Sequence, residues 1–120
     1  MRYMLLIYGD EKASAKMSRD EGEAMFREYG QFTTDIRNSG AFQAGAPLQP
    51  TSTATTVRSR NGKAVTTDGP YAETKEQLGG YYIVEAKNLD EAIAIASRIP
   101  RVRRGGAVEV RPIMELGPQP

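Results

Sequence analysis

The stretch RYMLLIY, residues 2–8, is a nearly unbroken apolar and aromatic run of strand length. A second run of this kind, YYIVEA, occupies residues 81–86 and follows Gly79 and Gly80. Runs without polar alternation predict central strands that are covered on both faces. We therefore expect these two segments to form the middle of a sheet, with the rest of the chain arranged around them.

A first helix is predicted to begin after residue 18. Ser18 and Glu21 match a capping box, in which the hydroxyl and the carboxylate each satisfy an unpaired backbone N–H. The sequence NSG at residues 38–40 supplies a C-terminal stop. Between these signals the apolar residues recur at helical spacing and predict one buried stripe. The stripe consists of Met25, Tyr29, Phe32 and Ile36.

A second helix is predicted between Asn88, which is its N-cap with Glu91 three positions on, and Pro100, which ends it. Residues 101–106 are then expected to form a loop. The apolar residues of this helix are expected on one face. They are Leu89, Ala92, Ile93, Ala96 and Ile99.

Three further strands complete the pattern. Residues 41–47 are a short strand candidate. Apolar and polar residues alternate over residues 107–111, which predicts a last strand, and a frayed tail is expected from about 115 to 120. Residues 57–60 and 63–66 flank Asn61-Gly62, a pair that takes the positive φ angles of a tight hairpin turn.

In this order the elements predict a single α+β domain over residues 1–120. The pattern is that of a ferredoxin-like split βαβ fold, with two helices on one face of an antiparallel sheet. Because the two central strands are too apolar to leave the other face in water, a partner must cover it. The most economical partner is a second copy packed sheet against sheet, so we expect a homodimer.

Composition excludes several classes of function. The 120 residues contain no Cys and no His, which removes Ser-His-Asp hydrolases, Cys proteases and the usual zinc sites. No apolar run is long enough to span a membrane, and the start of the chain lacks the features of a signal peptide, so a cytoplasmic location is expected. A formal net charge of +1 makes nucleic acid an unlikely ligand, and the arginines at 98, 101, 103 and 104 fit a solvated loop better.

The densest cluster of functional residue types lies between the hairpin and the second apolar strand. Asp68 opens an Asp-Gly-Pro turn, and Tyr71, Glu73 and Lys75 follow it closely. One interpretation is a structural turn with a solvated charged edge. The other is a binding loop, in which a partly desolvated Asp68 has a raised pKa and acts as a general base.

The run DGPYAETKE, residues 68–76, resembles the signature of the DGPF group within the YCII-related family. The resemblance extends to residues 2–8, 79–82 and 106–112, and Tyr71 stands where the group has phenylalanine. It implies a dimeric α+β barrel of ferredoxin-like protomers, with a cleft lined partly by the signature loop. Members of the wider family are suspected enzymes because many carry a His and an Asp, of which only the Asp can be carried over here, to Asp68. Some relatives are associated with extracytoplasmic-function sigma factors.

Two hypotheses about function follow. In the first, a small-molecule pocket binds a small acid, Asp68 transfers a proton, and the ligand-binding residues are Tyr71, Glu73, Lys75 and Arg111. In the second, the chain is a non-catalytic sensor or regulatory domain that associates with a sigma factor. No cofactor is predicted, and no metal site either, because the carboxylates lack an ordered spacing.

Overall fold

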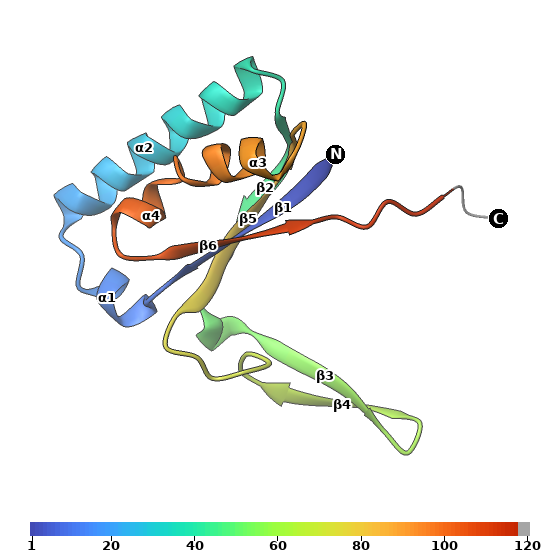
Figure 1. Ribbon diagram of the computed structural model, residues 1–120. Helices are drawn as coiled ribbons and strands as arrows, with labels where there is room; N and C mark the ends of the chain where they lie inside the picture. The colour runs from blue at the N-terminus through green and yellow to red at the C-terminus, as the bar shows by residue number, and fades with distance from the viewer. Residues whose placement is uncertain (118–120) are drawn as a thin grey trace.

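The computed structural model describes residues 1–117, so residues 118–120 of the expected tail lie outside the described residues (Figure 1). The strands are β1 Arg2–Gly9, β2 Phe42–Pro47, β3 Thr55–Arg60, β4 Lys63–Asp68, β5 Gln77–Glu85 and β6 Ala107–Pro112. The helices are α1 Glu11–Ala15, α2 Arg19–Asn38, α3 Leu89–Ala96 and α4 Pro100–Arg103, with a 3-10 turn η1 at Thr51–Thr53. No helix in this part of the chain is both long and apolar enough to cross a membrane.

Four strands form one antiparallel sheet in the order β2-β5-β1-β6. The two apolar runs of the sequence, β1 and β5, are its central strands, as predicted. With α2 between β1 and β2, and α3 between β5 and β6, the connections are those of the ferredoxin-like split βαβ fold. Figure 1 shows α2, α3 and α4 on one face of this sheet and α1 at the end of β1.

The hydrophobic core lies between the sheet and the helices. Alternate residues of β1 point into it: Tyr3, Leu5 and Ile7 are buried, whereas their neighbours are only partly covered. Val84 of β5 is fully buried beside them. The strand alternation therefore divides the sheet into a face packed against the helices and a face that no helix covers.

The first helix forms as predicted, with one change at its cap. Ser18 is the N-cap of α2 and its Oγ accepts a hydrogen bond from the Glu21 amide at 3.1 Å. The Glu21 carboxylate, however, accepts from the Ser18 hydroxyl rather than from a backbone amide. The predicted stripe packs inward, with Met25, Phe32 and Ile36 buried and Tyr29 partly buried.

The second helix ends earlier than predicted. Asn88 caps α3 as expected, but the helix stops at Ala96. Pro100 is the first residue of α4 and does not end a helix, because its missing N–H is not needed in a first turn. The expected loop at residues 101–106 is therefore partly helical. The buried face is also shifted: Ile95 is buried, whereas Leu89 and Ile93 are about half exposed.

Strands β3 and β4 form a separate two-stranded sheet that we call the arm, residues 55–68. Its turn has the predicted geometry, with φ of 52° at Asn61 and 78° at Gly62. Figure 1 shows the arm projecting from the rest of the chain, on the side of the four-stranded sheet away from the helices.

The uncovered face of the four-stranded sheet is called the open face. Strand alternation and the register place Met4, Leu6, Tyr81 and Ile83 on it, and all four are partly exposed. Arg111 lies opposite Met4, and Glu109 lies opposite Leu6. The open face is therefore apolar at its centre, with one ion pair toward the β6 edge.

Candidate functional site

A pocket of about 220 Å³ lies at one end of the sheet, where β1 ends and β5 begins, beneath α2 and α4. Its walls combine apolar and aromatic side chains with glycine backbone and a few polar groups. The residues that line it are Ile7, Gly9, Glu11, Ser14, Tyr29, Ala46, Pro47, Gln77, Gly79, Gly80, Tyr81, Tyr82 and Arg101. A mostly apolar cavity with a small number of polar groups is the usual form of a small-molecule site.

Arg101, on α4, is the cation of this pocket. Its Nη1 donates a hydrogen bond to Ser14 Oγ at 3.2 Å, and the side chain is half-buried. It forms no ion pair with any carboxylate of residues 1–117. A guanidinium has five N–H donors in a planar fork, so most of them remain for a ligand.

Two glycines give the Arg101 side chain its path across the end of the sheet. A Cβ on Gly106 would lie 2.2 Å from Arg101 Cγ and 2.5 Å from the Tyr8 carbonyl oxygen. A Cβ on Gly9 would lie 3.0 Å from Arg101 Cδ. No larger residue fits at position 106 without moving the arginine or the strand.

Tyr29 brings a hydroxyl to the pocket from α2. Burial raises the pKa of Tyr29 above its usual value of 10.0, and the nearby Arg101 guanidinium offsets part of this rise. The phenol therefore stays neutral at physiological pH and can donate a hydrogen bond. Tyr82 forms another part of the wall, held by an edge-on contact with Phe32 and a 2.7 Å hydrogen bond between its hydroxyl and that of Thr33.

The carboxylate of Glu11 is already engaged. One of its oxygens accepts from the Thr51 amide at 2.8 Å and the other from the Thr51 hydroxyl at 2.7 Å. The Glu11 amide in turn donates to Gln77 Oε1 at 2.9 Å. Glu11 thus ties α1 to η1 and β5, and because its partners are neutral groups it keeps its negative charge. Arg101 and Glu11 are therefore the two charged side chains that line the pocket, and they form no ion pair with each other.

The predicted site residues of the loop lie elsewhere in the single chain. Asp68, at the end of β4, is exposed and its carboxylate hydrogen-bonds no residue of 1–117. In the turn after it, Gly69 has φ of 109°, and its amide donates to the Ala54 carbonyl at 2.8 Å. Tyr71 is 78% exposed and its ring lies beneath the Arg58 guanidinium, 5.2 Å from the ring centroid.

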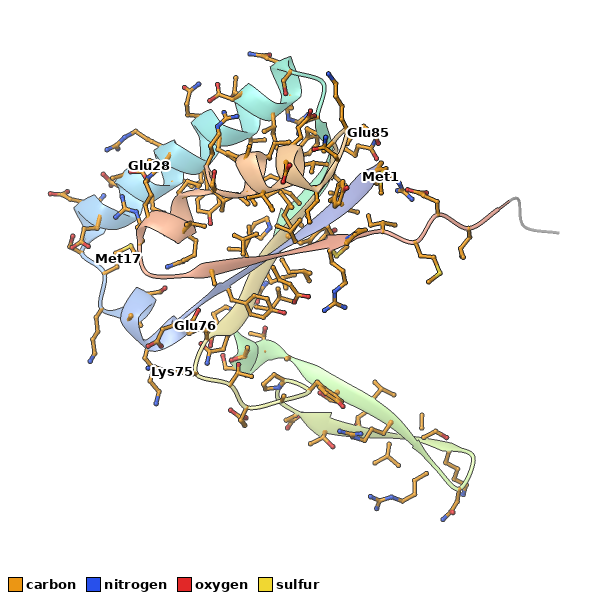
Figure 2. The ribbon with its side chains drawn as sticks, in the orientation of Figure 1. Met1, Met17, Glu28, Lys75, Glu76 and Glu85 are labelled. Atoms are coloured by element: carbon orange, nitrogen blue, oxygen red, sulfur yellow. The ribbon has the colours of Figure 1, made fainter. Side chains whose placement is uncertain are left out.

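The other predicted residues are also apart from the pocket. Glu73 and Lys75 are exposed, and Figure 2 shows Lys75 in the loop that joins the arm to β5. Arg111 is on the open face, where it pairs with Glu109 of the same strand. The five predicted residues are therefore spread over the arm, the loop and β6, and none of them lines the pocket.

The pocket residues that lie nearest in sequence to the predicted loop are Gln77, Gly79 and Gly80, which follow the signature run of residues 68–76. Gln77 also fastens the end of the loop, because its Nε2 donates to the Thr74 carbonyl at 2.6 Å. The signature run therefore ends at the pocket although its charged residues do not reach it.

Sequence reasoning missed Arg101. It treated the four arginines of residues 98–104 as equivalent members of a solvated loop, but they differ in their partners. Arg98 pairs with Asp35, and Arg103 and Arg104 both pair with Glu28, so three of the four are bound to carboxylates of α2. The sequence did contain one usable signal, namely Gly9 at the end of β1 and Gly106 just before β6. A glycine at a strand end often marks a place where another group approaches the backbone closely.

Within residues 1–117, no group of three or more His, Cys, Asp or Glu side chains is placed to hold a metal ion. The pocket offers hydrogen bonding, apolar contact, the positive charge of Arg101 and the hydrogen-bonded carboxylate of Glu11.

A family model, the YCII-related domain, matches residues 1–117 of the chain. The chain is also similar to an uncharacterised protein of Rhizobium meliloti (strain 1021). The two are 36% identical over 114 residues, which cover 94% of this chain and 92% of the relative.

Proposed function

The chain belongs to the YCII-related family, as its signature predicted, and we propose that it binds a small organic anion in the pocket around Arg101. The observation that carries the proposal is a half-buried guanidinium, held by Ser14 and two glycines, that forms no ion pair with a carboxylate of residues 1–117 and lies in a pocket with aromatic walls. A planar fork of this kind pairs with a carboxylate through two parallel hydrogen bonds.

The size of the pocket limits the ligand. A cavity of roughly 150 Å³ accepts benzene, so about 220 Å³ accepts one ring with a small substituent. Drug-sized ligands need roughly 300–1,000 Å³. A single-ring or short-chain carboxylate therefore fits, with its apolar body against Ile7 and Tyr82 and its charge on Arg101.

The neutral Tyr29 hydroxyl adds a second contact. A tyrosine hydroxyl is protonated at physiological pH, so it can donate a hydrogen bond to an anionic ligand. Together with Arg101, it would hold a carboxylate from two sides. This arrangement provides binding without requiring a reaction, and proton transfer by Asp68 is a separate hypothesis.

Isothermal titration with benzoate and its neutral analogue benzamide tests the proposal. Hydrogen bonds to charged groups contribute about 1.5–3 kcal/mol, so Arg101→Gln should weaken benzoate binding by roughly ten- to hundredfold and benzamide binding much less. Arg103→Gln is the matched control, because it lies on the same helix and its guanidinium is bound to Glu28 outside the pocket. That variant should bind benzoate like the wild type.

Asp68→Asn separates the two site hypotheses. If benzoate binding survives Asp68→Asn and is lost in Arg101→Gln, the pocket is the site. The reverse result would place the site at the signature loop. Binding of neither compound to the wild type would contradict the small-anion proposal and favour the regulatory alternative, association with a sigma factor.

A further inference from the structure

Glu11 and Arg101 bring opposite charges to the wall of one pocket, yet they form no ion pair with each other. Neutral groups hold each of them instead. Arg101 donates to Ser14 Oγ, and the Glu11 carboxylate accepts from the amide and the hydroxyl of Thr51. Within residues 1–117 neither charged group has a partner of opposite charge, so both charges remain for a ligand.

The two charged groups are anchored on opposite sides of the pocket. The Arg101 side chain passes the end of β1 and the start of β6, close to Gly9 and Gly106. Thr51, which holds the Glu11 carboxylate, belongs to η1 and follows β2. In the strand order β2-β5-β1-β6, β1 and β2 are separated by two strand intervals, which is roughly 10 Å. A ligand in the pocket therefore meets a positive group at one end and a negative group at the other.

Both groups keep hydrogen-bonding capacity after these contacts. A carboxylate offers about four lone-pair sites, and the two bonds from Thr51 leave the others for a ligand. The bond to Ser14 uses only part of the donor fork of Arg101. Because Ser14 and Thr51 hold the two side chains before a ligand arrives, little side-chain ordering opposes binding.

We propose that the ligand of this pocket is a zwitterion, a small amino carboxylate whose carboxylate binds Arg101 and whose ammonium group binds Glu11. The inference rests on the proposed function and specifies the class of its ligand. A plain carboxylate pairs with Arg101 but leaves the like charge of Glu11 in the same pocket, which opposes its binding. A plain amine has the converse defect at Arg101. Only a ligand with both charges complements both side chains.

The rest of the pocket wall suits an apolar body between the two charges. It includes the side chains of Ile7, Pro47 and Tyr82 and the glycine pair at residues 79 and 80. The cavity of about 220 Å³ has room for one ring. A ring that carries a carboxylate and, across from it, an ammonium group on a short arm therefore matches both the size and the charges of the pocket.

Isothermal titration at pH 7 with meta-aminomethylbenzoate and meta-methylbenzoate tests the proposal. The two compounds share a ring and a carboxylate and differ in the ammonium group, which is protonated at this pH as in lysine. We expect the ammonium compound to bind the wild type roughly ten- to hundredfold more tightly, the gain typical of a hydrogen bond between charged groups. The compound meta-hydroxymethylbenzoate has a similar size without the charge, so it should bind like meta-methylbenzoate.

Glu11→Gln should remove this preference. We expect meta-aminomethylbenzoate to bind this variant at least tenfold more weakly than the wild type, and meta-methylbenzoate to bind at least as tightly as before. Glutamine keeps an oxygen for the Thr51 amide, and the Thr51 hydroxyl can accept from its NH₂ group, so the link to η1 persists. Glu73→Gln is the matched control, because it removes the same charge from an exposed residue outside the pocket, and it should keep the preference.

The outcomes separate this inference from the proposed function. If the wild type binds all three compounds equally, the zwitterion inference is overturned while the small-anion proposal stands. The same holds if the preference for the ammonium compound survives Glu11→Gln or is matched by meta-hydroxymethylbenzoate. If the wild type binds neither these compounds nor benzoate, the proposed function itself fails and the inference fails with it.

Discussion

The β1–β5 ladder and the β3–β4 arm are both antiparallel pairs, yet they are stabilised by different interactions. In the ladder, Leu5 and Val84 are completely buried beneath the helices. In the arm, all residues of β4 are exposed, and the pair depends on its backbone hydrogen bonds and on the turn at Asn61-Gly62. Burial makes the first pair part of the core, whereas the second is a surface element available for binding.

Leu5→Ala should produce the largest difference between these two regions. Removing a buried leucine side chain leaves a cavity, and we expect a loss of about 2–5 kcal/mol in the free energy of unfolding. Val65→Ala in the arm should stay within about 0.5 kcal/mol of the wild type. Urea denaturation at matched protein concentration measures both, and equal losses in the two variants would show that the arm belongs to the core.

Gly106→Ala should cause the next largest loss of stability, because the added methyl group would clash with the Tyr8 carbonyl and the Arg101 side chain. We expect a cost of about 1–3 kcal/mol, as for other overpacked sites, together with loss of benzoate binding. Gly30→Ala is the control: nothing lies within 4 Å of the added Cβ, and helix propensity should raise stability by about 0.5–1 kcal/mol. A stable Gly106→Ala variant that still binds benzoate would contradict the placement of Arg101.

Gly62→Ala should have a smaller and purely local effect. Residue 62 has φ of 78°, which an alanine adopts at a cost of about 1 kcal/mol. Since the arm lies outside the core, the cost should appear as faster hydrogen exchange in β3 and β4, with the melting temperature of the monomer unchanged. Faster exchange in β1 as well would mean that the arm and the sheet unfold together.

The smallest effect on stability should come from substituting Glu28, which Figure 2 shows on α2 toward α4. A hydrogen bond from Arg104 lowers the pKa of Glu28 below its usual value of 4.5. The carboxylate therefore contributes stability above pH 4.5, and the contribution is lost as pH falls through the lower folded-state pKa. Glu28→Gln should be slightly less stable than the wild type at pH 7, and the two stabilities should converge at low pH. Parallel curves across this range would contradict the assignment.

The sheet and its main helix follow from sequence because their signals are local. Apolar runs identify β1 and β5, a cap and a stripe identify α2, and Asn61-Gly62 identifies the hairpin turn. The end of α3 was predicted wrongly because a proline can either end one helix or begin another, and only tertiary packing decides between the two. Helical spacing likewise predicted that Ile93 is buried. The position of the core instead buries Ile95 and leaves Ile93 about half exposed.

The pocket was less accessible to sequence reasoning because it depends on distant residues. Arg101 acquires its role from Ser14, Gly9 and Gly106, which lie far from one another along the chain and meet only in the fold. Charge density along the sequence instead emphasised residues 68–76, where Asp68, Glu73 and Lys75 are exposed in the single chain. The three other arginines of residues 98–104 all have carboxylate partners, a distinction that only the three-dimensional arrangement provides.

Mapping benzoate onto the backbone by amide NMR titration tests the central claim most directly. If the Arg101 pocket is the binding site, the largest shift changes should fall on Gly9, Gly79, Gly80 and Arg101, and they should vanish in Arg101→Gln. Shift changes confined to residues 68–76, or an unaltered pattern in Arg101→Gln, would contradict the account.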